Sequence, residues 1–357
     1  MQGSERAVSI DQNATYDVTI IGGGPCGLFA AFYAGMRGLR SIIVDSLEEL
    51  GGTLTAIYPE KFIYDIAGFP KVLAKDYVEQ AAEQALSMGA EVSLKTEVLN
   101  LEHNEAENVF DLTTSQGTLR TRTVIICAGI GAFEPKKLDV EGIEHFEDGK
   151  GVHYFAERIE GFRDKDVMIV GGGDSAVDWA MTLGPLAKTV TLIHRSKFRA
   201  HEHTVQQLIH GPADVYYPDY AVKAVHGDGR LREVTFHHVK EGTEQTIPVD
   251  ELIVAIGFLA DLGPLKQWGF EIQRNQIVVD PITMSTNIPG IFGAGDIVAY
   301  PAKFKLIATG VAEAVTAVNH CFTYINPDAR LDPGHSTNIM EKREKQERKE
   351  SEAAAVS

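Results

Sequence analysis

The chain is poor in cysteine and lacks paired redox or metal-binding motifs. Its three cysteines, Cys26, Cys127 and Cys321, are 101 and 194 residues apart, and no C-x-x-C occurs. This spacing argues against a disulfide framework, a dithiol redox pair and a zinc site built from cysteine pairs. Three scattered thiols also cannot hold an iron–sulfur cluster. Residues 201–203 read H-E-H, which lacks the spacing of a zinc H-E-x-x-H motif, so no metal is predicted.

Positive charge and uninterrupted apolar sequence are also scarce. There are 33 Lys and Arg against 50 Asp and Glu, which gives a net charge of -17 and argues against binding to nucleic acid. An uncharged stretch of 19 residues, 18–36, contains three consecutive glycines and Pro25, which exclude a transmembrane helix. The residues before it have no secretory pattern, so we expect no membrane partner and a cytoplasmic location.

The same uncharged stretch contains a dinucleotide-binding pattern. It comprises an apolar strand, three spaced glycines and a helix, at residues 17–21, at Gly22, Gly24 and Gly27, and at residues 28–37. The first glycine of such a pattern makes a tight turn, the second lets a pyrophosphate approach the backbone, and the third packs helix against strand. A second strand at residues 40–44 ends at Asp45, which is placed to accept hydrogen bonds from a ribose.

A second pattern of this kind follows further along the chain. It comprises a strand at residues 166–170, a turn with Gly171, Gly173, Asp174, Ser175 and Ala176, and a helix expected from Val177. The next strand, residues 190–193, ends in His194 instead of an acid. Arg195 and Arg199 follow and can make bidentate contacts to a phosphate. Because no carboxylate is available for a ribose 2′-hydroxyl, this site is predicted to prefer NADP over NAD.

A third turn completes the pattern of the whole chain. Residues 291–296 end in Gly295 and Asp296, before a helical pattern at residues 307–322. Two nucleotide sites of different polarity predict FAD together with a nicotinamide, and Asp296 suits the ribityl or pyrophosphate part of FAD. Because the first and third turns enclose the second, the predicted fold is α/β, with two Rossmann-like domains and the nicotinamide domain inserted into a split FAD domain. The expected FAD-binding parts are residues 15–132 and 257–334, and the NADP-binding domain is residues 133–256.

Several segments resemble the ferredoxin–NADP reductases of the thioredoxin-reductase type. The resemblance covers about residues 16–338, and its specific segments are LGGTLTAIYPEKFIYDIAGFPKV, CAGIGAFEPKKL, GGGDSAVDWAM, HRSKFRAHEH and HSTN, at residues 50–72, 127–138, 171–181, 194–203 and 335–338. Thioredoxin reductases themselves carry a C-x-x-C that this chain lacks. The resemblance implies hydride exchange between NADP(H) and FAD at the flavin N5, followed by single-electron transfer to ferredoxin, with flavodoxin as an alternative carrier.

The resemblance also implies individual site residues. The positions that match FAD contacts are Asp45, Thr53, Tyr58, Val98, Phe133, Asp296 and Thr337. Tyr58 is implied to stack on one face of the flavin ring, and Thr337 to lie near its N5. The tail, residues 335–357, is implied to extend across a homodimer and to place His335 on the other face of the partner subunit's ring. The end of this tail is expected to be disordered.

Two other functions remain open at this point. Cys26 lies in a GGGPCG turn at a helix N-terminus, where a thiolate is stabilised, and flavoproteins resembling bacillithiol disulfide reductases carry a cysteine in a similar turn. A low-molecular-weight disulfide reductase that uses Cys26 is therefore the alternative enzyme, although nearby FAD phosphates disfavour a thiolate. The third candidate is a catalytically idle module that senses FAD or NADP, and two intact fingerprints weigh against it.

An acidic chain needs a local basic patch to bind an acidic ferredoxin. Lysines close in sequence to the Tyr58 segment and to the turn at Asp296 are expected to form this patch. They are Lys61, Lys71, Lys75, Lys303 and Lys305.

Overall fold

The computed structural model describes residues 10–12, 14–154, 159–341, 343 and 345. Contacts within the chain define two compact units. Unit 1 comprises Met1–Ala132 and Ala260–Ser357, and unit 2 comprises Phe133–Leu259. Unit 2 is thus inserted between two parts of unit 1, and the chain returns to unit 1 after Leu259 instead of after residue 256.

A seven-stranded sheet forms the centre of unit 1, in the order β5-β2-β1-β8-β7-β6, with β21 also paired to β8. The strands are β1 Thr15–Ile21, β2 Ser41–Val44, β5 Glu91–Ser93, β6 Val98–Asn104, β7 Val109–Thr114, β8 Gly117–Ile126 and β21 Ile291–Gly293. The pairs among β5, β2, β1, β8 and β21 are parallel, whereas β6 and β7 are antiparallel additions. The turns after β1, β2 and β21 therefore gather at the carboxyl edge of the parallel strands, where such sheets bind ligands.

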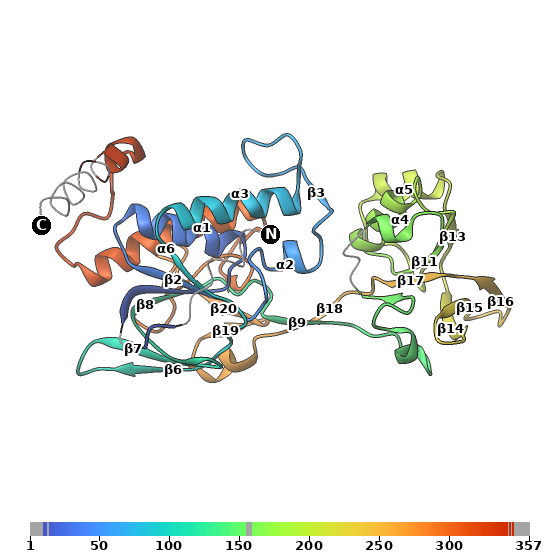
Figure 1. The fold of residues 1–357 in the computed structure, drawn as a ribbon, viewed down its shortest axis with the longest axis horizontal. Coiled ribbons are helices and arrows are strands. Elements are labelled where there is room, and N and C mark those ends of the chain that lie inside the picture. The colour runs from blue at the N-terminus through green and yellow to red at the C-terminus, as the bar shows by residue number, and fades with distance from the viewer. Residues whose placement is uncertain (1–9, 13, 155–158, 342, 344, 346–357) are drawn as a thin grey trace, which may run out of the picture. The chain divides into compact units, whose positions relative to one another are not determined.

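Three helices lie on one face of this sheet (Figure 1). They are α1 Pro25–Met36, α3 Ala74–Ser87 and α6 Ile307–Ile325, and α1 packs against both of the others. Every residue of β2 is buried, which explains its continuous apolar sequence. Ala30, Ala31 and Ala34 of α1 are also buried, and their small side chains let the helix lie close to its neighbours.

The remaining elements of unit 1 are short. They are α2 Thr53–Ala56, the hairpin of β3 Phe62–Ile63 and β4 Val72–Leu73, the 3-10 helix Gly263–Gln267, and a three-stranded sheet of β19 Ile272–Gln273, β20 Gln276–Val278 and β22 Val298–Ala299. The two segments that connect the units form β9 Ala132–Pro135 and β18 Phe258–Asp261, which pair with each other.

Unit 2 has a five-stranded parallel sheet in the order β10-β17-β11-β12-β13. Its strands are β10 Val152–His153, β11 Asp166–Val170, β12 Thr189–Ile193, β13 Asp214–Tyr216 and β17 Glu251–Val254, and its helices are α4 Asp174–Leu183 and α5 Glu202–Ile209. An antiparallel sheet of β14 Tyr220–Gly227, β15 Leu231–His238 and β16 Glu244–Pro248 follows, and two 3-10 helices span Ile143–Phe146 and Ile159–Phe162. Unit 2 is therefore a second Rossmann-like arrangement with its own core.

Both fingerprint helices begin earlier than the sequence patterns indicate. Helix α1 begins at Pro25 instead of Leu28, and α4 begins at Asp174 instead of Val177. Proline suits a first helical turn because its missing N–H would have no partner within the helix. Gly24 and Gly173 are the N-caps, so the second glycine of each turn lies directly at a helix N-terminus.

Candidate functional site

Packing requires glycine at two positions of the first turn. A Cβ atom at Gly22, where φ is +108°, would lie 2.4 Å from the Cys127 carbonyl oxygen, and one at Gly27 would lie 1.8 Å from the Gly22 oxygen. At Gly24 the nearest contact would be an ordinary 3.9 Å, to the Gly51 oxygen. The protein's own packing therefore does not demand glycine at position 24. The room that Gly24 leaves at the N-terminus of α1 fits a pyrophosphate.

Asp45, at the end of β2, orders the same turn. Its carboxylate accepts hydrogen bonds from the Gly23 N–H at 2.6 Å and from the Leu47 N–H at 2.9 Å. Burial raises the pKa of this carboxyl, while the two backbone hydrogen bonds act in the opposite direction. Asp45 therefore supports the turn in addition to its predicted role as a ribose acceptor.

A second pair of glycines faces the first turn. The Gly51 N–H donates to the Gly23 oxygen at 2.8 Å, and a Cβ atom at Gly52 would lie 3.2 Å from the Gly24 Cα atom. Gly52 is the N-cap of α2, and Thr53 is the first residue of that helix. Thr53 is therefore held beside the pyrophosphate space by the contact between two glycine loops.

Tyr58 lies just beyond α2 and is half-buried. The Lys61 Nζ atom is 5.3 Å from the centroid of the Tyr58 ring, and the Lys61 N–H donates to the Tyr58 oxygen at 3.0 Å. Tyr58 is therefore held in a tight turn between α2 and β3.

Sequence patterns did not identify the carboxylate that holds the third turn. Glu313 of α6 accepts hydrogen bonds from the Gly295 N–H at 2.8 Å and from the Tyr300 hydroxyl at 2.5 Å, and it pairs with the Lys303 ammonium. The Glu313 and Lys303 side chains are only 4% and 7% exposed. Glu313 therefore fixes both ends of the segment that carries Asp296.

Cys26 packs against the same segment and against helix α6. Cβ atoms placed at Gly295 and Gly310 would lie 2.9 and 2.3 Å from the Cys26 sulfur, so the thiol fills the space that these glycines leave. Burial, together with the negative charges of Asp296 and Glu313, raises the pKa of Cys26 to about 12. A thiolate is therefore disfavoured at neutral pH, although Cys26 lies in the first turn of α1.

Val98 and Phe133 complete the predicted contacts within unit 1 and the connecting strand. Val98 is buried at the start of β6. The Thr96 N–H donates to the Asp45 oxygen at 2.8 Å, which brings the start of β6 toward the end of β2. The backbone of Phe133 is part of β9, but its side chain lies outside the described residues.

The described part of the tail lies at the opposite end of α1. Arg37, the C-cap of α1, donates to the carbonyl oxygens of residues 330–331 at 3.0 and 3.2 Å, and the Arg343 side chain contacts the C-terminal end of α3. Between these contacts His335 and Thr337 are exposed. Since α1 is about 17 Å long, the structure does not bring His335 or Thr337 to the glycine turn of the same chain (Figure 1). Most of the tail beyond residue 341 lies outside the described residues.

In the glycine turn of unit 2, as in that of unit 1, packing requires the first glycine, and the second leaves open space at the helix N-terminus. A Cβ atom at Gly171 would lie 2.2 Å from the Ala255 oxygen and 2.9 Å from the Ala176 Cβ atom, so packing requires glycine at 171 and a small residue at 176. No described atom lies within 4 Å of a Cβ atom placed at Gly173. Ser175 follows in the first turn of α4, which no side chain caps. The space at Gly173 therefore fits a second pyrophosphate.

The loop after β12 is anchored to this turn. The Arg199 N–H donates to the Gly172 oxygen at 2.8 Å, and the His201 N–H donates to the Asp174 Oδ1 atom at 3.1 Å. The side chains of Arg195 and Arg199 are exposed on the loop. The backbone of Arg199 is therefore attached directly to the glycine turn, whereas the Arg195 carbonyl oxygen accepts a hydrogen bond from the Asp219 N–H at 3.2 Å.

His194 supports this loop from the interior. A Cβ atom at Gly172 would lie 2.2 Å from the His194 ring, and the His194 Nε2 atom is 3.1 Å from the Lys197 carbonyl oxygen. Burial lowers the pKa of His194, and the two neighbouring arginines lower it further. His194 is therefore uncharged at neutral pH, and its observed contacts are those of a packing residue. A direct contact between His194 and a nucleotide stays a prediction.

Two kinds of site are absent from the part of the chain that the structure describes. No group of three or more His, Cys, Asp or Glu side chains is arranged to hold a metal ion. No helix in this part is both long enough and apolar enough to cross a membrane. Cys127 and Cys321 are buried free thiols, and burial raises the pKa of both.

Comparison with known proteins agrees with these features. Residues 16–320 match the family described as pyridine nucleotide-disulphide oxidoreductase. The chain is 50% identical over 327 residues to the ferredoxin–NADP reductase of Halalkalibacterium halodurans, with 91% of this chain and 98% of that one covered. It is 49% identical over 335 residues to the ferredoxin–NADP reductase of Geobacillus kaustophilus, with 94% and 100% covered. The resemblance inferred from the sequence motifs is therefore confirmed.

Among solved structures, the thioredoxin reductase of Lactococcus lactis has a similar fold. It is 26% identical to this chain, the TM-score is 0.74, and the match covers 88% of this chain and 100% of that one. This similarity and the family match confirm the predicted α/β fold with two Rossmann-like domains.

Proposed function

Because the chain belongs to the pyridine nucleotide-disulphide oxidoreductase family, we propose that it is a flavoenzyme that transfers electrons between NADP(H) and ferredoxin. One observation carries this proposal: about half of the residues are identical to those of relatives named ferredoxin–NADP reductase, over nearly the whole length of both chains. In the direction of ferredoxin reduction, NADPH and two oxidised ferredoxins give NADP⁺, two reduced ferredoxins and one proton.

Unit 1 binds FAD. Gly24 at the N-terminus of α1 would leave room for the pyrophosphate, Asp45 would hold the ribose, and Thr53 would contact the cofactor from the facing loop. Asp296 is held for the ribityl or pyrophosphate part by the contact between Glu313 and the backbone of the turn. Val98 and Phe133 complete the FAD contacts.

Unit 2 binds NADP(H). The pyrophosphate fits the open space at Gly173, and Asp174 and Ser175 lie in the same helical turn. Arg195 and Arg199 bind the 2′-phosphate, because guanidinium groups form bidentate contacts with phosphate oxygens. This pair of cations selects NADP over NAD.

The protein contributes position more than acid–base chemistry. When bound, FAD supplies hydride acceptance at N5 and the return of electrons one at a time. Tyr58 would orient the flavin ring by stacking on one face. Thr337 would hold its hydroxyl toward the flavin, and His335 would cover the ring face that Tyr58 leaves open.

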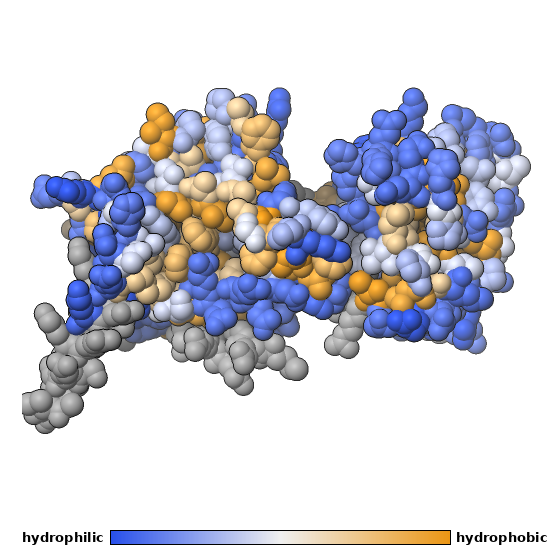
Figure 2. All heavy atoms as spheres, turned by 90° about the horizontal axis from the view of Figure 1, so that it is seen from above, coloured by the Kyte–Doolittle hydropathy of each residue, from blue (hydrophilic) through white to orange (hydrophobic). Residues whose placement is uncertain are grey.

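A homodimer explains the position of the tail. Within one chain His335 and Thr337 lie beyond the C-terminal end of α1 and not at its N-terminal turn, so we propose that they serve the flavin of the partner subunit. The side of unit 1 on which α1 and α3 lie carries a broad group of apolar residues (Figure 2). Helix α1 contributes the half-buried Phe29, Phe32 and Tyr33, and an apolar face of this kind favours association. We place the dimer in the cytoplasm, with flavodoxin as an alternative electron carrier.

The disulfide reductase alternative depends on Cys26. Its sulfur is packed between Gly295 and Gly310, and its raised pKa keeps it protonated at neutral pH. Cys26 is only partly exposed, and a protonated thiol in such a position is a poor nucleophile for a disulfide. The geometry therefore favours transfer to ferredoxin without a thiol intermediate.

Steady-state assays of the purified protein test this proposal. We expect a yellow protein that contains FAD and that consumes NADPH when oxidised ferredoxin is supplied. NADPH consumption that responds to bacillithiol disulfide and not to ferredoxin would support the alternative. A colourless protein that cannot be reconstituted with FAD would contradict both enzymes.

A further inference from the structure

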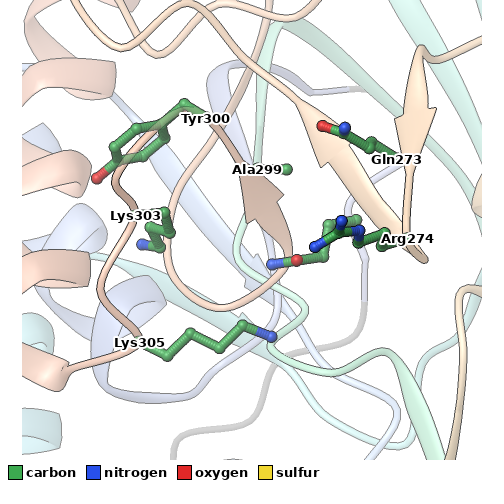
Figure 3. Close-up of a pocket in the computed structure, with 7 residues that line it drawn as sticks. Gln273, Arg274, Ala299, Tyr300, Lys303 and Lys305 are labelled. Atoms are coloured by element: carbon green, nitrogen blue, oxygen red, sulfur yellow. The ribbon is translucent and has the colours of Figure 1, made fainter.

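A polar pocket lies beside the turn that carries Asp296, and none of the residues predicted to contact FAD or NADP lines it. Its volume is about 240 Å³, and it is lined by Gln273, Arg274, Gln276, Ala299, Tyr300, Lys303 and Lys305 (Figure 3). The pocket is formed where the turn between β19 and β20 meets β22 and the segment that follows it. The Gln276 amide donates to the Asp296 and Val298 carbonyl oxygens at 2.7 and 2.9 Å. The pocket wall is therefore continuous with the turn proposed to bind FAD.

The cations of this pocket differ in their partners. The Lys303 ammonium is buried against Glu313, so its charge is compensated. Arg274 and Lys305 are exposed, and neither forms an ion pair with another described residue. Figure 3 shows the Lys305 side chain extended toward the Arg274 side of the pocket, whereas the Lys303 side chain ends on the Tyr300 side. Two uncompensated cations therefore converge on one small opening.

Arg274 lies in a tight turn with a left-handed backbone conformation. Arg274 and Asn275 have φ values of +49° and +62°, and they form the two-residue turn between Gln273 and Gln276. Turns with two left-handed residues usually contain Asn, Asp or Gly. An arginine at this position costs some backbone strain and places a guanidinium at the tip of the hairpin.

Exposed apolar side chains are next in sequence to residues that line the pocket. Phe304 and Leu306, on either side of Lys305, are 69% and 45% exposed, and Ile272 of β19 is 39% exposed. Apolar residues with interspersed cations are typical of a small docking face for an acidic protein, because apolar contact gives affinity and charge gives orientation.

The other lysines expected to bind ferredoxin contact side chains of this chain. Lys75 is paired with Glu60 at 2.8 Å. Lys61 lies over the Tyr58 ring at 5.3 Å, and Lys71 lies over the Phe62 ring at 3.6 Å. Lys303 is buried against Glu313. Of the five lysines expected to bind ferredoxin, Lys305 is therefore the one that has none of these contacts and lies beside a second exposed cation, Arg274.

We propose that Arg274 and Lys305, with Phe304 and Leu306 between and beside them, form the docking face for ferredoxin. Acidic side chains of the ferredoxin enter the pocket, and its iron–sulfur cluster is held next to the turn at Asp296. This proposal rests on the proposed function. It also explains how a chain of net charge -17 binds an acidic partner, since two local cations outweigh the distant field at contact distance.

Charge reversal tests the docking face. The variants Arg274→Glu and Lys305→Glu should each raise the KM for ferredoxin about 10-fold at low salt, and the double variant more, because like charges across an interface oppose association. The dependence of KM on salt should also become weaker. NADPH oxidation with a small uncharged quinone should stay at the wild-type rate. Arg232→Glu, an exposed position on β15 of unit 2, is the matched control and should leave the KM for ferredoxin unchanged.

Four other results would overturn the proposal in different ways. An unchanged KM for ferredoxin in the double variant would place the docking face elsewhere. Loss of bound FAD or of quinone reduction would assign the pocket to the flavin site. Dissociation of the dimer on size-exclusion chromatography would assign it to the subunit interface. A wild-type enzyme that reduces quinone but no ferredoxin at any salt concentration would refute the proposed function itself, and this proposal with it.

Discussion

Glu313 is a single buried carboxylate that contacts three groups of one segment, from Gly295 to Lys303. We expect Glu313→Gln to destabilise the protein by about 3 kcal/mol, because the Lys303 ammonium would stay buried without a counter-charge. The turn at Asp296 would lose rigidity, so FAD binding should weaken as well. Denaturant unfolding and equilibrium release of FAD measure the two effects.

A double variant provides the control for this prediction. Glu313→Gln combined with Lys303→Met removes both charges and keeps similar volumes. It should recover part of the lost stability, because replacing both members of a buried ion pair is often nearly neutral. Wild-type stability and FAD retention in the single variant would show that Glu313 does not hold the turn.

Cys26 provides the second test at the scale of single residues. Cys26→Ala should keep turnover with ferredoxin within about twofold of wild type, because a protonated, enclosed thiol takes no part in the transfer. Steady-state rates with ferredoxin, before and after treatment of the wild-type protein with an alkylating reagent, check this expectation. A large loss of turnover in the variant would restore the disulfide reductase alternative.

The glycine turns could be predicted from sequence, whereas the buried carboxylate of Glu313, which holds the turn at Asp296, could not. Gly22, Gly24 and Gly27 stand at fixed spacing beside a β-type run, so the pattern alone indicates their roles. A buried acid such as Glu313 depends on which loop its helix packs against, and that is a long-range property. One signal was present: Glu313 is the only Asp, Glu, Lys or Arg in the 19-residue helix α6. A lone charge in such a helix indicates a paired, buried position.

At the scale of elements, we propose that the loop between β12 and α5 selects the nicotinamide coenzyme. Arg195→Ala and Arg199→Ala should each raise the KM for NADPH about 10-fold, because a charge-assisted hydrogen bond contributes about 1.5–3 kcal/mol. The KM for NADH should change little, since NADH has no 2′-phosphate. Steady-state kinetics with both coenzymes check this, with Arg232→Ala as the control. Equal losses with NADPH and NADH would contradict the assignment.

At the amino-terminal edge of the unit 2 sheet, one carboxylate contacts three cationic side chains. Glu251, the first residue of β17, lies 2.6 Å from the His153 Nε2 atom and 2.5 Å from the Lys165 Nζ atom, and it also pairs with Arg230. Burial alone would raise the pKa of Glu251. The contacts with His153 and Lys165 outweigh burial and lower the pKa from 4.5 to about 2.

This pKa shift predicts how the stability of unit 2 depends on pH. A carboxyl whose pKa is depressed by folding stabilises the protein above its unfolded pKa, and this contribution is lost as pH falls from about 4.5 to about 2. We expect a loss of at most about 3 kcal/mol across this window, reduced by solvent screening because the three cations are partly exposed.

Tryptophan fluorescence can isolate unit 2 in the intact protein. The chain has two tryptophans, so Trp268→Phe leaves Trp179 of α4 as the reporter. In this background Glu251→Gln should remove the pH-dependent part of the unfolding free energy between about pH 4.5 and 2. The same dependence with and without Glu251 would mean that other groups cause it.

Strands and helices with a clear apolar pattern could be predicted from sequence. The residues at which the helices begin were predicted less well. The expected strand at residues 166–170 has the bounds of β11, because a β-branched run ends at a glycine turn. Helix starts were misplaced by three residues, at Pro25 and Asp174, because the apolar periodicity begins only after the first turn. A cap and a first turn are defined by backbone conformation and not by apolar spacing.

At the scale of the whole molecule, the order of the motifs predicts that one nucleotide-binding unit interrupts the other. This order is a property of the sequence alone, since the second fingerprint stands between the first and the turn at Asp296. The docking pocket could not be predicted in the same way. Arg274 lies in a hairpin turn and Lys305 in an irregular segment, neither belongs to a nucleotide motif, and only the packing of β20 against β22 brings them to one opening.

The most direct test of the central claim follows the flavin colour through a single turnover. The Cys26→Ala protein is mixed without oxygen first with NADPH and then with oxidised ferredoxin, in a double-mixing stopped-flow experiment. The account predicts that visible flavin absorbance is lost in the first mix and returns in the second at wild-type rates, with two ferredoxins reduced per flavin. If the bleached flavin instead regained its colour only with a low-molecular-weight disulfide, and only when Cys26 was present, electrons would leave through sulfur and the account would be wrong.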